Sequence, residues 1–433
     1  MTHYVIIGTG IAGMSAATTL RTADPAAEIT LVSEDPHAFY SRPGLAYCLS
    51  DEIPEKQLTI YSRQDWKTLN ATHIEGQVAR INPVDHQVEI KNLPPLAYDR
   101  LLLATGAAAV DLDVRGVNLK GVVKLDDFED TLQILSLARH TKTAVVVGGG
   151  IVSMELVEGL LARGVLVHYF LRGDRYWSNV LDEAESRIVE HRLSKEGVLL
   201  HYQTEIAEIL GWNRKVAGIR TRKGETIRCE MVATAIGVKP RLQLAQAAGL
   251  STERGILVNE YLQTSDPDIF AAGDVAQVYD PQTGRSVIDN LWTPGREQGK
   301  AAAWNMAGKK KPYRRAVAAN VLRLAGIMLT VIGAVGSGRD EDLVSVARGS
   351  SETWLQLPNT IAMASGNEYN QLRLMVGETT LVGAVVLGEQ KLSLPLQELV
   401  AVQTDITPIR SQLLQPGAPL GQIVMDFWTS IKG

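Results

Sequence analysis

The start of the chain constrains its fold more than any other stretch. An apolar strand at residues 5–7 leads into the glycine turn GTGIAG at residues 8–13, and a helical segment follows. A second apolar strand covers residues 28–32 and ends near Glu34. Strand, glycine turn, helix, strand and acid in this order are typical of a dinucleotide-binding βαβ unit.

Each residue of this turn has a physical reason. Gly8 permits the tight turn, Gly10 lets the backbone approach a pyrophosphate, and Gly13 lets the helix pack close to the strand. Ile11 and Ala12 open the helix, whose N-terminal N–H groups can bind phosphates. The carboxylate at the end of the second strand, about twenty residues further on, can accept hydrogen bonds from both ribose hydroxyls. The sequence therefore predicts a nucleotide cofactor here.

The same pattern occurs a second time. A strand at residues 144–147 enters GGGIVS at residues 148–153, a helix runs to about residue 163, and a strand follows at residues 165–171. The predicted contacts to this second nucleotide come from Gly148, Gly150, Ile151 and Val152, while a small serine takes the third glycine position. Two nucleotides bound side by side indicate electron transfer between them.

The end of the second unit departs from the NAD pattern. No carboxylate stands near Leu171, and Arg172 and Arg175 follow instead. An acid in that position would repel a 2′-phosphate, whereas arginine can pair with one. We hypothesise that the chain uses NADPH rather than NADH. The alternative is that both arginines are surface residues and that Asp174 or a backbone group holds the ribose.

Three further strand ends carry candidate ligand contacts. A buried strand closes on Thr105-Gly106, a later one ends at Gly237, and a third, at residues 269–272, runs into Gly273-Asp274. Ligands in open α/β sheets bind at the carboxyl ends of the strands. A Thr-Gly turn can also serve only to end its strand.

Several charged residues near these turns have two readings. Arg42-Pro43 precedes a short predicted helix through Cys48, and its arginine is either a phosphate clamp or a solvated loop residue. Glu155 lies in the first turn of the second nucleotide-binding helix, where it caps the helix dipole or points at the gap between two stacked cofactor rings. Glu297 lies near the start of a helix predicted at residues 294–305.

Length and composition set the outer limits. A chain of 433 residues is too long for one core, and a net charge of -5 gives no reason to expect nucleic acid. Cys48 and Cys229 form no CxxC motif, so neither a disulfide framework nor a metal site is predicted. Cys229 is predicted to be a packed strand residue.

No signal peptide is predicted at the N-terminus, and the apolar run at residues 321–336 is interpreted as a buried strand pair, not a membrane span.

The last part of the chain, from about residue 309, differs in its sequence pattern from the nucleotide-binding units. The basic stretch at residues 309–315 is interpreted as a solvated linker, with docking of an acidic partner as the alternative. Short alternating strands then fill residues 321–387, and an apolar helix follows near residues 394–402. This pattern predicts an α+β domain without a cofactor motif of its own.

Together these motifs identify a resemblance. The chain resembles the two-dinucleotide-binding flavoproteins of the pyridine nucleotide–disulfide oxidoreductase fold. The matching motifs are GTGIAG at Gly8, YDRLLLATG at Tyr98, GGGIVSME at Gly148, TAIGVKP at Thr234 and IFAAGD at Ile269. The tail, with LRLAGI at Leu322 and LVGAVVLG at Leu381, is similar to that of rubredoxin reductases and of the flavin part of NADH-dependent nitrite reductases.

The resemblance implies an α/β fold with two Rossmann-like three-layer domains and a C-terminal α+β domain. The FAD-binding domain is expected at residues 1–112 and 238–312, the NAD(P)-binding domain at 113–237, and the C-terminal, interface-type domain at 313–433. FAD is expected on the first glycine turn and NADPH, or NADH, on the second.

The resemblance also implies roles for single residues. Asp274 is expected to contact the FAD ribitol, Glu297 to lie near the flavin ring, and Glu155 to lie near flavin N5 and the nicotinamide. Arg172 falls where NADPH-using members place an arginine. Tyr47 stands roughly where related reductases often carry a lysine that pairs with the counterpart of Glu155.

The chain departs from the thiol-dependent members of the family. It has no CxxxxC after the second strand, and Pro43 occupies the position at which single-cysteine oxidases carry their thiol. Cys48 lies a helical turn further on and is not its equivalent. Arg42-Pro43 instead is similar to the signature of rubredoxin and ferredoxin reductases, so thiol chemistry is disfavoured.

The expected activity is electron transfer from NAD(P)H through flavin to a small iron or iron–sulfur protein of rubredoxin or ferredoxin type. A cytoplasmic location is expected, with no nucleic acid or membrane partner; a homodimer is possible, although no sequence feature requires it. Three alternatives stay open: the flavin subunit of a nitrite reductase system, an NAD(P)H-sensing flavoprotein of low turnover, and a thiol-dependent oxidase or reductase.

Overall fold

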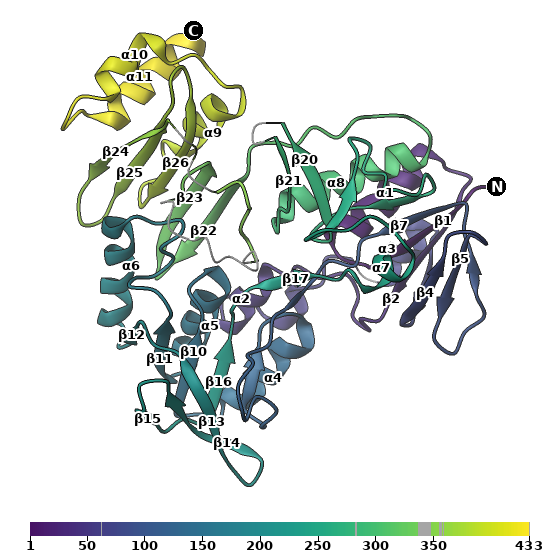
Figure 1. Cartoon of the computed structure of the whole chain (residues 1–433), viewed down its shortest axis with the longest axis horizontal. Helices are drawn as coiled ribbons and strands as arrows, with labels where there is room; N and C mark the ends of the chain where they lie inside the picture. The colour runs from purple at the N-terminus through teal and green to yellow at the C-terminus, as the bar shows by residue number, and fades with distance from the viewer. Residues whose placement is uncertain (62, 282–283, 337–347, 355–356, 358, 433) are drawn as a thin grey trace.

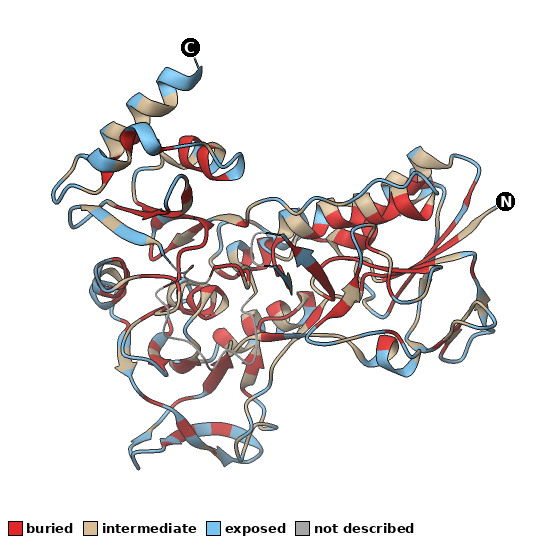
Figure 2. Cartoon of the chain, turned by 45° about the horizontal axis from the view of Figure 1, so that its top comes forward, coloured by how far each residue is buried: buried red, intermediate tan, exposed pale blue. Residues whose placement is uncertain are grey.

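The computed structural model describes residues 1–61, 63–281, 284–336, 348–354, 357 and 359–432. Its described part is built around two parallel sheets and one antiparallel sheet (Figure 1). Buried residues run through the central strands and along the helix faces that cover them (Figure 2). The predicted class, with two Rossmann-like domains and a C-terminal α+β domain, is confirmed. The domain boundaries stay a prediction.

The first sheet holds five parallel strands in the order β19-β7-β1-β2-β3. Its last strand in the chain, β19, and the helix α8 come from far beyond the rest of this unit. Helix α8 packs so closely on α1 that a Cβ on Gly299 would lie 2.1 Å from the Ala12 carbonyl oxygen. The elements are β1 (His3–Ile7), α1 (Ile11–Ala23), β2 (Glu28–Ser33), β3 (Thr72–Glu75), β7 (Arg100–Leu103), β19 (Ile269–Ala271) and α8 (Trp292–Met306).

The second sheet repeats this architecture, with five parallel strands in the order β12-β11-β10-β16-β9. Its strands are β9 (Val122–Lys124), β10 (Thr143–Val147), β11 (Leu166–Leu171), β12 (Leu199–Tyr202) and β16 (Met231–Thr234). Its helices are α4 (Phe128–Ala138), α5 (Ile151–Ala162) and α6 (Glu183–Lys195). A small antiparallel sheet of β13 (Ile206–Trp212), β14 (Lys215–Thr221) and β15 (Thr226–Ile227) comes directly before β16 in the chain.

Short elements join the two parallel sheets. The chain leaves the first sheet through β8 (Ala107–Ala109) and returns through β17 (Val238–Pro240), and these two strands pair with each other. The remaining elements of the first unit are β4 (Val78–Asn82), β5 (Gln87–Ile90), β6 (Leu96–Ala97), β18 (Ile256–Val258), β20 (Ala276–Asp280), β21 (Arg285–Val287), α2 (Gly44–Leu49), η1 (Glu55–Gln57), α3 (Arg63–Leu69) and α7 (Gln243–Ala247).

The C-terminal unit is an antiparallel sheet in the order β22-β23-β26-β25-β24, with helices on one side. The first two strands confirm the strand pair predicted from the apolar run. The elements are β22 (Ala319–Leu324), β23 (Ile327–Gly333), β24 (Ile361–Gly366), β25 (Gln371–Val376), β26 (Leu381–Leu387), α9 (Ser393–Ala401), α10 (Thr407–Leu413) and α11 (Leu420–Lys432).

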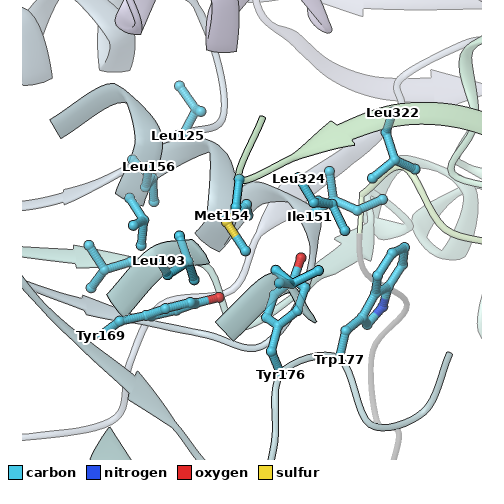
Figure 3. Packing of buried hydrophobic residues seen from close by; sticks show 14 of the residues in the cluster. Leu125, Ile151, Met154, Leu156, Tyr169, Tyr176, Trp177, Leu193, Leu322 and Leu324 are labelled. Carbon is cyan, nitrogen blue, oxygen red and sulfur yellow. The ribbon is translucent and has the colours of Figure 1, made fainter. Parts of the chain in front are cut away.

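The C-terminal sheet shares a hydrophobic core with the second parallel sheet. Leu322 and Leu324 of β22 belong to the same buried cluster as Ile151 of α5, Tyr176 and Trp177 (Figure 3). The C-terminal unit therefore stabilises the second nucleotide-binding unit through apolar contacts that exclude water.

Two predictions are wrong in detail. Cys229 is buried as predicted, but it lies between β15 and β16 and belongs to no strand. Arg315, assigned to a solvated linker, has a side chain that is only 3% exposed and donates to both carboxylate oxygens of Asp289, at 2.7 and 2.8 Å. A buried guanidinium needs such a partner. The basic composition of residues 309–315 does not show that one of them is paired with a distant carboxylate.

Candidate functional site

Both glycine turns press against the end of a neighbouring strand. Gly8 has φ +108, and a Cβ there would lie 2.2 Å from the Ala104 carbonyl oxygen. Gly148 has φ +150, and a Cβ there would lie 2.3 Å from the Ala235 carbonyl oxygen. Only glycine fits these positions, because both the backbone conformation and the space exclude a side chain. The sequence repeat is thus also a structural repeat.

The middle glycine of the first turn, Gly10, has free space around it, whereas Gly8 and Gly13 are tightly packed. Gly10 is the N-cap of α1, no side chain caps the helix there, and a Cβ on Gly10 would meet no atom within 4 Å. Gly13, by contrast, sits so close to the strand that its Cβ would lie 2.0 Å from the Gly8 carbonyl oxygen. The start of α1, at Ile11 and Ala12, therefore points its N–H groups toward open space, as binding of a diphosphate requires.

A cavity of about 570 Å³ opens beside this turn. The structure brings together in its wall seven residues that the sequence predicts to bind cofactor, namely Gly8, Gly10, Glu34, Arg42, Thr105, Gly106 and Asp274. This wall suits a nucleotide with a diphosphate, since it combines glycine backbone, an arginine for the phosphate charge and a carboxylate for ribose hydroxyls.

Two further arginines from distant parts of the chain, Arg241 and Arg348, line the cavity together with Arg42. Arg42 donates to the Asp126 carbonyl oxygen at 2.5 Å, Arg348 donates to the same oxygen at 3.0 Å, and Arg241 pairs with Glu34 at 3.1 Å. Burial acts to raise the pKa of Asp126, but Arg348 and Arg42 hold it below its ordinary value. The sequence analysis missed Asp126, Arg241 and Arg348.

Gly273 and Asp274 lie just beyond the end of β19, and Asp274 lines the cavity. The Gly273 N–H donates to the side-chain oxygen of Gln298 on α8 at 2.8 Å, which fixes the turn. Burial raises the pKa of Asp274, while Arg348 and Arg42 oppose that rise. The carboxyl group is thus held beside two guanidinium groups at the end of a buried strand.

The second turn has a polar support beneath it. Gly150 is the N-cap of α5, and its carbonyl oxygen accepts from Ser153 Oγ at 2.7 Å and from Tyr176 Oη at 3.4 Å. Ile151 is buried in the core below, and Val152 follows it on α5. Gly237, predicted to end the neighbouring strand, lies beyond that end, because β16 stops at Thr234 and β17 begins at Val238. The serine at the third glycine position is therefore accommodated by a hydrogen bond to the turn itself.

The two arginines after β11 differ in their surroundings. Arg172 is exposed, directly beyond the end of the strand. Arg175 turns back toward its own loop, donating to Asp174 at 3.1 Å and to the Ser178 carbonyl oxygen at 3.1 Å. Only the first of the two thus stands open toward a ligand at the strand end.

The residues expected near the flavin lie outside the wall of this cavity. Tyr47 is 41% exposed on α2, with the Arg323 guanidinium 5.9 Å from its ring centre. Glu297 pairs with Lys300 and Arg296 at 3.0 Å each, and these partners outweigh burial and lower its pKa. Pro43 is exposed at the start of α2. Their predicted roles at the flavin stay predictions.

Glu155 lies on α5 one turn after Gly150. Burial raises its pKa to about 8, Arg348 opposes the rise and Glu158 adds to it. The carboxyl group is therefore mostly protonated near neutral pH, and it can donate a hydrogen bond without placing a negative charge beside an anionic nucleotide.

Replacement of Glu155 by Gln is expected to flatten the pH dependence of stability. The folded-state pKa of about 8 lies above the ordinary value of 4.5, so folding favours the protonated form between these two pH values. The contribution of Glu155 to stability therefore declines as the pH rises from 4.5 to 8 and stays low above 8. Melting temperatures of the FAD-loaded wild type and Glu155→Gln should converge near pH 5 and separate by pH 9, with the variant higher. Equal pH profiles would contradict the assignment.

Two kinds of site are not found in the described part of the chain. Among those residues, no group of three or more His, Cys, Asp or Glu side chains is arranged to hold a metal ion. None of the described helices is both long enough and apolar enough to span a bilayer.

Comparison with known proteins agrees with this geometry. A model of the pyridine nucleotide-disulphide oxidoreductase family matches residues 2–306. The rhodocoxin reductase of Rhodococcus erythropolis is 31% identical over 314 residues, covering 72% of this chain and 73% of the relative. The crystal structure of a ferredoxin reductase from Rhodopseudomonas palustris superposes with a TM-score of 0.85 at 23% identity, covering 98% of this chain and all of the other.

A longer relative is similar over nearly the whole chain. Nitrite reductase (NAD(P)H) of Bacillus subtilis (strain 168) is 28% identical over 423 residues, which is 96% of this chain but 49% of the relative. The chain thus spans about half the length of that protein.

Proposed function

The chain belongs to the pyridine nucleotide-disulphide oxidoreductase family, and from this premise we propose that it is an FAD-dependent oxidoreductase that takes electrons from NAD(P)H and delivers them to a small iron or iron–sulfur protein. FAD and NAD(P)H are the cofactors of this family. The observation that carries the proposal is the pair of glycine turns, each pressed against the end of a neighbouring strand, of which the first opens on a cavity lined by seven predicted cofactor residues.

The residues around the first turn would hold FAD. The N-terminus of α1 and the open backbone at Gly10 receive the diphosphate, Arg42 balances its charge, and Glu34 accepts hydrogen bonds from ribose. When bound, the flavin supplies the redox chemistry, accepting two electrons as a hydride and releasing them one at a time. The protein provides orientation and electrostatics.

The second turn would hold the nicotinamide nucleotide. Gly150 and the start of α5 bind its diphosphate, and Arg172 pairs with the 2′-phosphate of NADPH. Glu155, protonated near neutral pH, helps to position the reacting rings and places no negative charge beside the anionic nucleotide. No side chain is required as acid or base for the transfer of a hydride, so these residues act by positioning.

A thiol is given no part in this reaction. Cys48 is 4% exposed inside a hydrophobic cluster, and burial raises its pKa, which suppresses the reactive thiolate. Cys48→Ser is therefore expected to keep the rate of NADPH-dependent acceptor reduction within about twofold of the wild type, since a buried thiol that stays protonated is inert. A loss of most activity with retained FAD would point to thiol chemistry instead.

A nitrite reductase system is the second candidate. Its support is the similarity of 96% of the chain to 49% of a nitrite reductase. In that role the chain would be a flavin subunit that passes electrons to a separate sirohaem protein.

Anaerobic stopped-flow spectroscopy tests the proposal. The FAD-loaded protein is reduced with NADPH or NADH and then mixed with rubredoxin, ferredoxin or a sirohaem nitrite reductase. Fast flavin bleaching followed by fast reoxidation with one of the iron–sulfur proteins is expected. Preferential reoxidation by the nitrite reductase would favour the second candidate, and a persistent charge-transfer band with slow turnover would favour a sensor.

A further inference from the structure

The loop between β11 and α6 carries Arg172, yet it has no regular secondary structure to define its shape. It spans residues 172–182 and includes Trp177, whose φ is +51. A bulky residue in the left-handed region is strained, and such strain persists only where the surroundings enforce it. Contacts from elsewhere in the chain must therefore hold this loop.

Arg373, on β25 of the C-terminal sheet, supplies such contacts. Its Nε and Nη2 each donate to one carboxylate oxygen of Glu185 at 3.0 Å, and Nη2 also donates to the Val180 carbonyl oxygen at 2.6 Å. The fourth contact, from Nη1 to the Val335 carbonyl oxygen at 2.7 Å, anchors the guanidinium in its own unit. A planar fork of this kind fixes both position and angle.

The pair is buried between the two units. The side chains of Arg373 and Glu185 are 5% and 1% exposed. Glu185 also completes the capping box at the start of α6, where its carboxylate accepts from the Asp182 N–H at 2.9 Å. One guanidinium thus restrains the end of the loop and the first turn of the following helix together.

The restraint passes along the loop to the second glycine turn. The Tyr176 carbonyl oxygen accepts from Ser186 on α6 at 2.7 Å, and Tyr176 Oη reaches the Gly150 carbonyl oxygen at 3.4 Å. Trp177 packs on Trp354, with ring centres 6.1 Å apart, and on the cluster around Ile151 (Figure 3). The loop therefore lies between the C-terminal sheet and the turn that would bind the diphosphate.

We propose that Arg373 is a positioning residue for the pyridine nucleotide. It holds the 172–182 loop in the shape that presents Arg172 and supports Gly150, although it belongs to a unit without any cofactor motif. This inference rests on the proposed binding of NADPH at the second turn. The C-terminal unit is thereby part of the nucleotide site and not only a covering domain.

The test is calorimetric titration of the FAD-loaded full chain with NADP⁺ and NAD⁺, which bind without turnover. Arg373→Met is expected to raise the Kd for NADP⁺ about fivefold, the range of couplings carried through packed side chains, and to leave FAD content unchanged. Arg410→Met is the matched control, because its Nε donates to the Gly377 carbonyl oxygen within the C-terminal unit. An unchanged Kd for NADP⁺ in Arg373→Met would overturn the proposal.

A double variant separates positioning from stability. Arg373→Met alone strands a buried carboxylate, whereas Arg373→Met with Glu185→Gln removes that charge and retains a capping-box side chain. We expect the double variant to regain melting temperature but not NADP⁺ affinity, and recovery of both would refute a positioning role. If the wild type itself binds neither nucleotide, the proposed function fails, whatever Arg373 does.

Discussion

Gly10→Val is expected to leave the fold intact and to lower the affinity for FAD by about 100-fold. The fold has room for a side chain here, because a Cβ at Gly10 would meet no atom within 4 Å apart from its chain neighbours. The valine side chain would fill the cavity and keep the diphosphate from the N–H groups of α1. Loss of two charge-assisted hydrogen bonds at about 1.5 kcal/mol each accounts for that factor. Flavin content after dialysis and FAD titration of the apoprotein measure it.

Gly8→Val is the matched contrast. There the Cβ would lie 2.2 Å from the Ala104 carbonyl oxygen, in a backbone conformation that side chains rarely adopt. This variant should unfold or melt far below the wild type even without cofactor. If Gly10→Val bound FAD as tightly as the wild type, the cavity beside the first turn would not be the flavin site.

Arg172→Ala is expected to raise the KM for NADPH about 30-fold and to change the KM for NADH little. A charge-assisted hydrogen bond from arginine to phosphate contributes about 2 kcal/mol to binding. NADH has no 2′-phosphate, so its binding does not depend on this bond. Initial rates with both nucleotides at saturating acceptor give the two values. The exposed position of Arg172 beyond β11 is the basis of this expectation.

Arg175→Ala is the control for that experiment. Because Arg175 donates to Asp174 and to the Ser178 carbonyl oxygen, its loss should lower the melting temperature more than it changes nucleotide preference. A wild type whose rates with NADH match or exceed those with NADPH would contradict the assignment of Arg172, and Asp174 or the backbone would then hold the ribose.

The sequence predicts what is encoded locally. The glycine turns depend on residues a few positions apart, so spacing alone identifies Gly8, Gly10 and Gly148 and the strands beside them. The same holds for the alternation that predicts β22 and β23. Cys229 marks the limit of such patterns, since apolar alternation signals burial but does not show that the backbone leaves its strand.

The arginines of the cavity could not be predicted in the same way. Arg42 and Asp126 are 84 residues apart, and Arg348, which lies 222 residues beyond Asp126, donates to the same backbone carbonyl oxygen. No periodicity or motif connects residues at such distances, because only the folded topology brings them together. The same argument applies to Arg373 and Glu185, which are 188 residues apart.

The late origin of β19 and α8 has a consequence for biosynthesis. The first sheet lacks its outer strand and its covering helix until the chain has been made as far as Met306. The second parallel sheet, whose strands lie between Val122 and Thr234, is complete much earlier. On the ribosome, the second parallel sheet can therefore pair all of its strands while the first sheet still exposes an unpaired edge at β7.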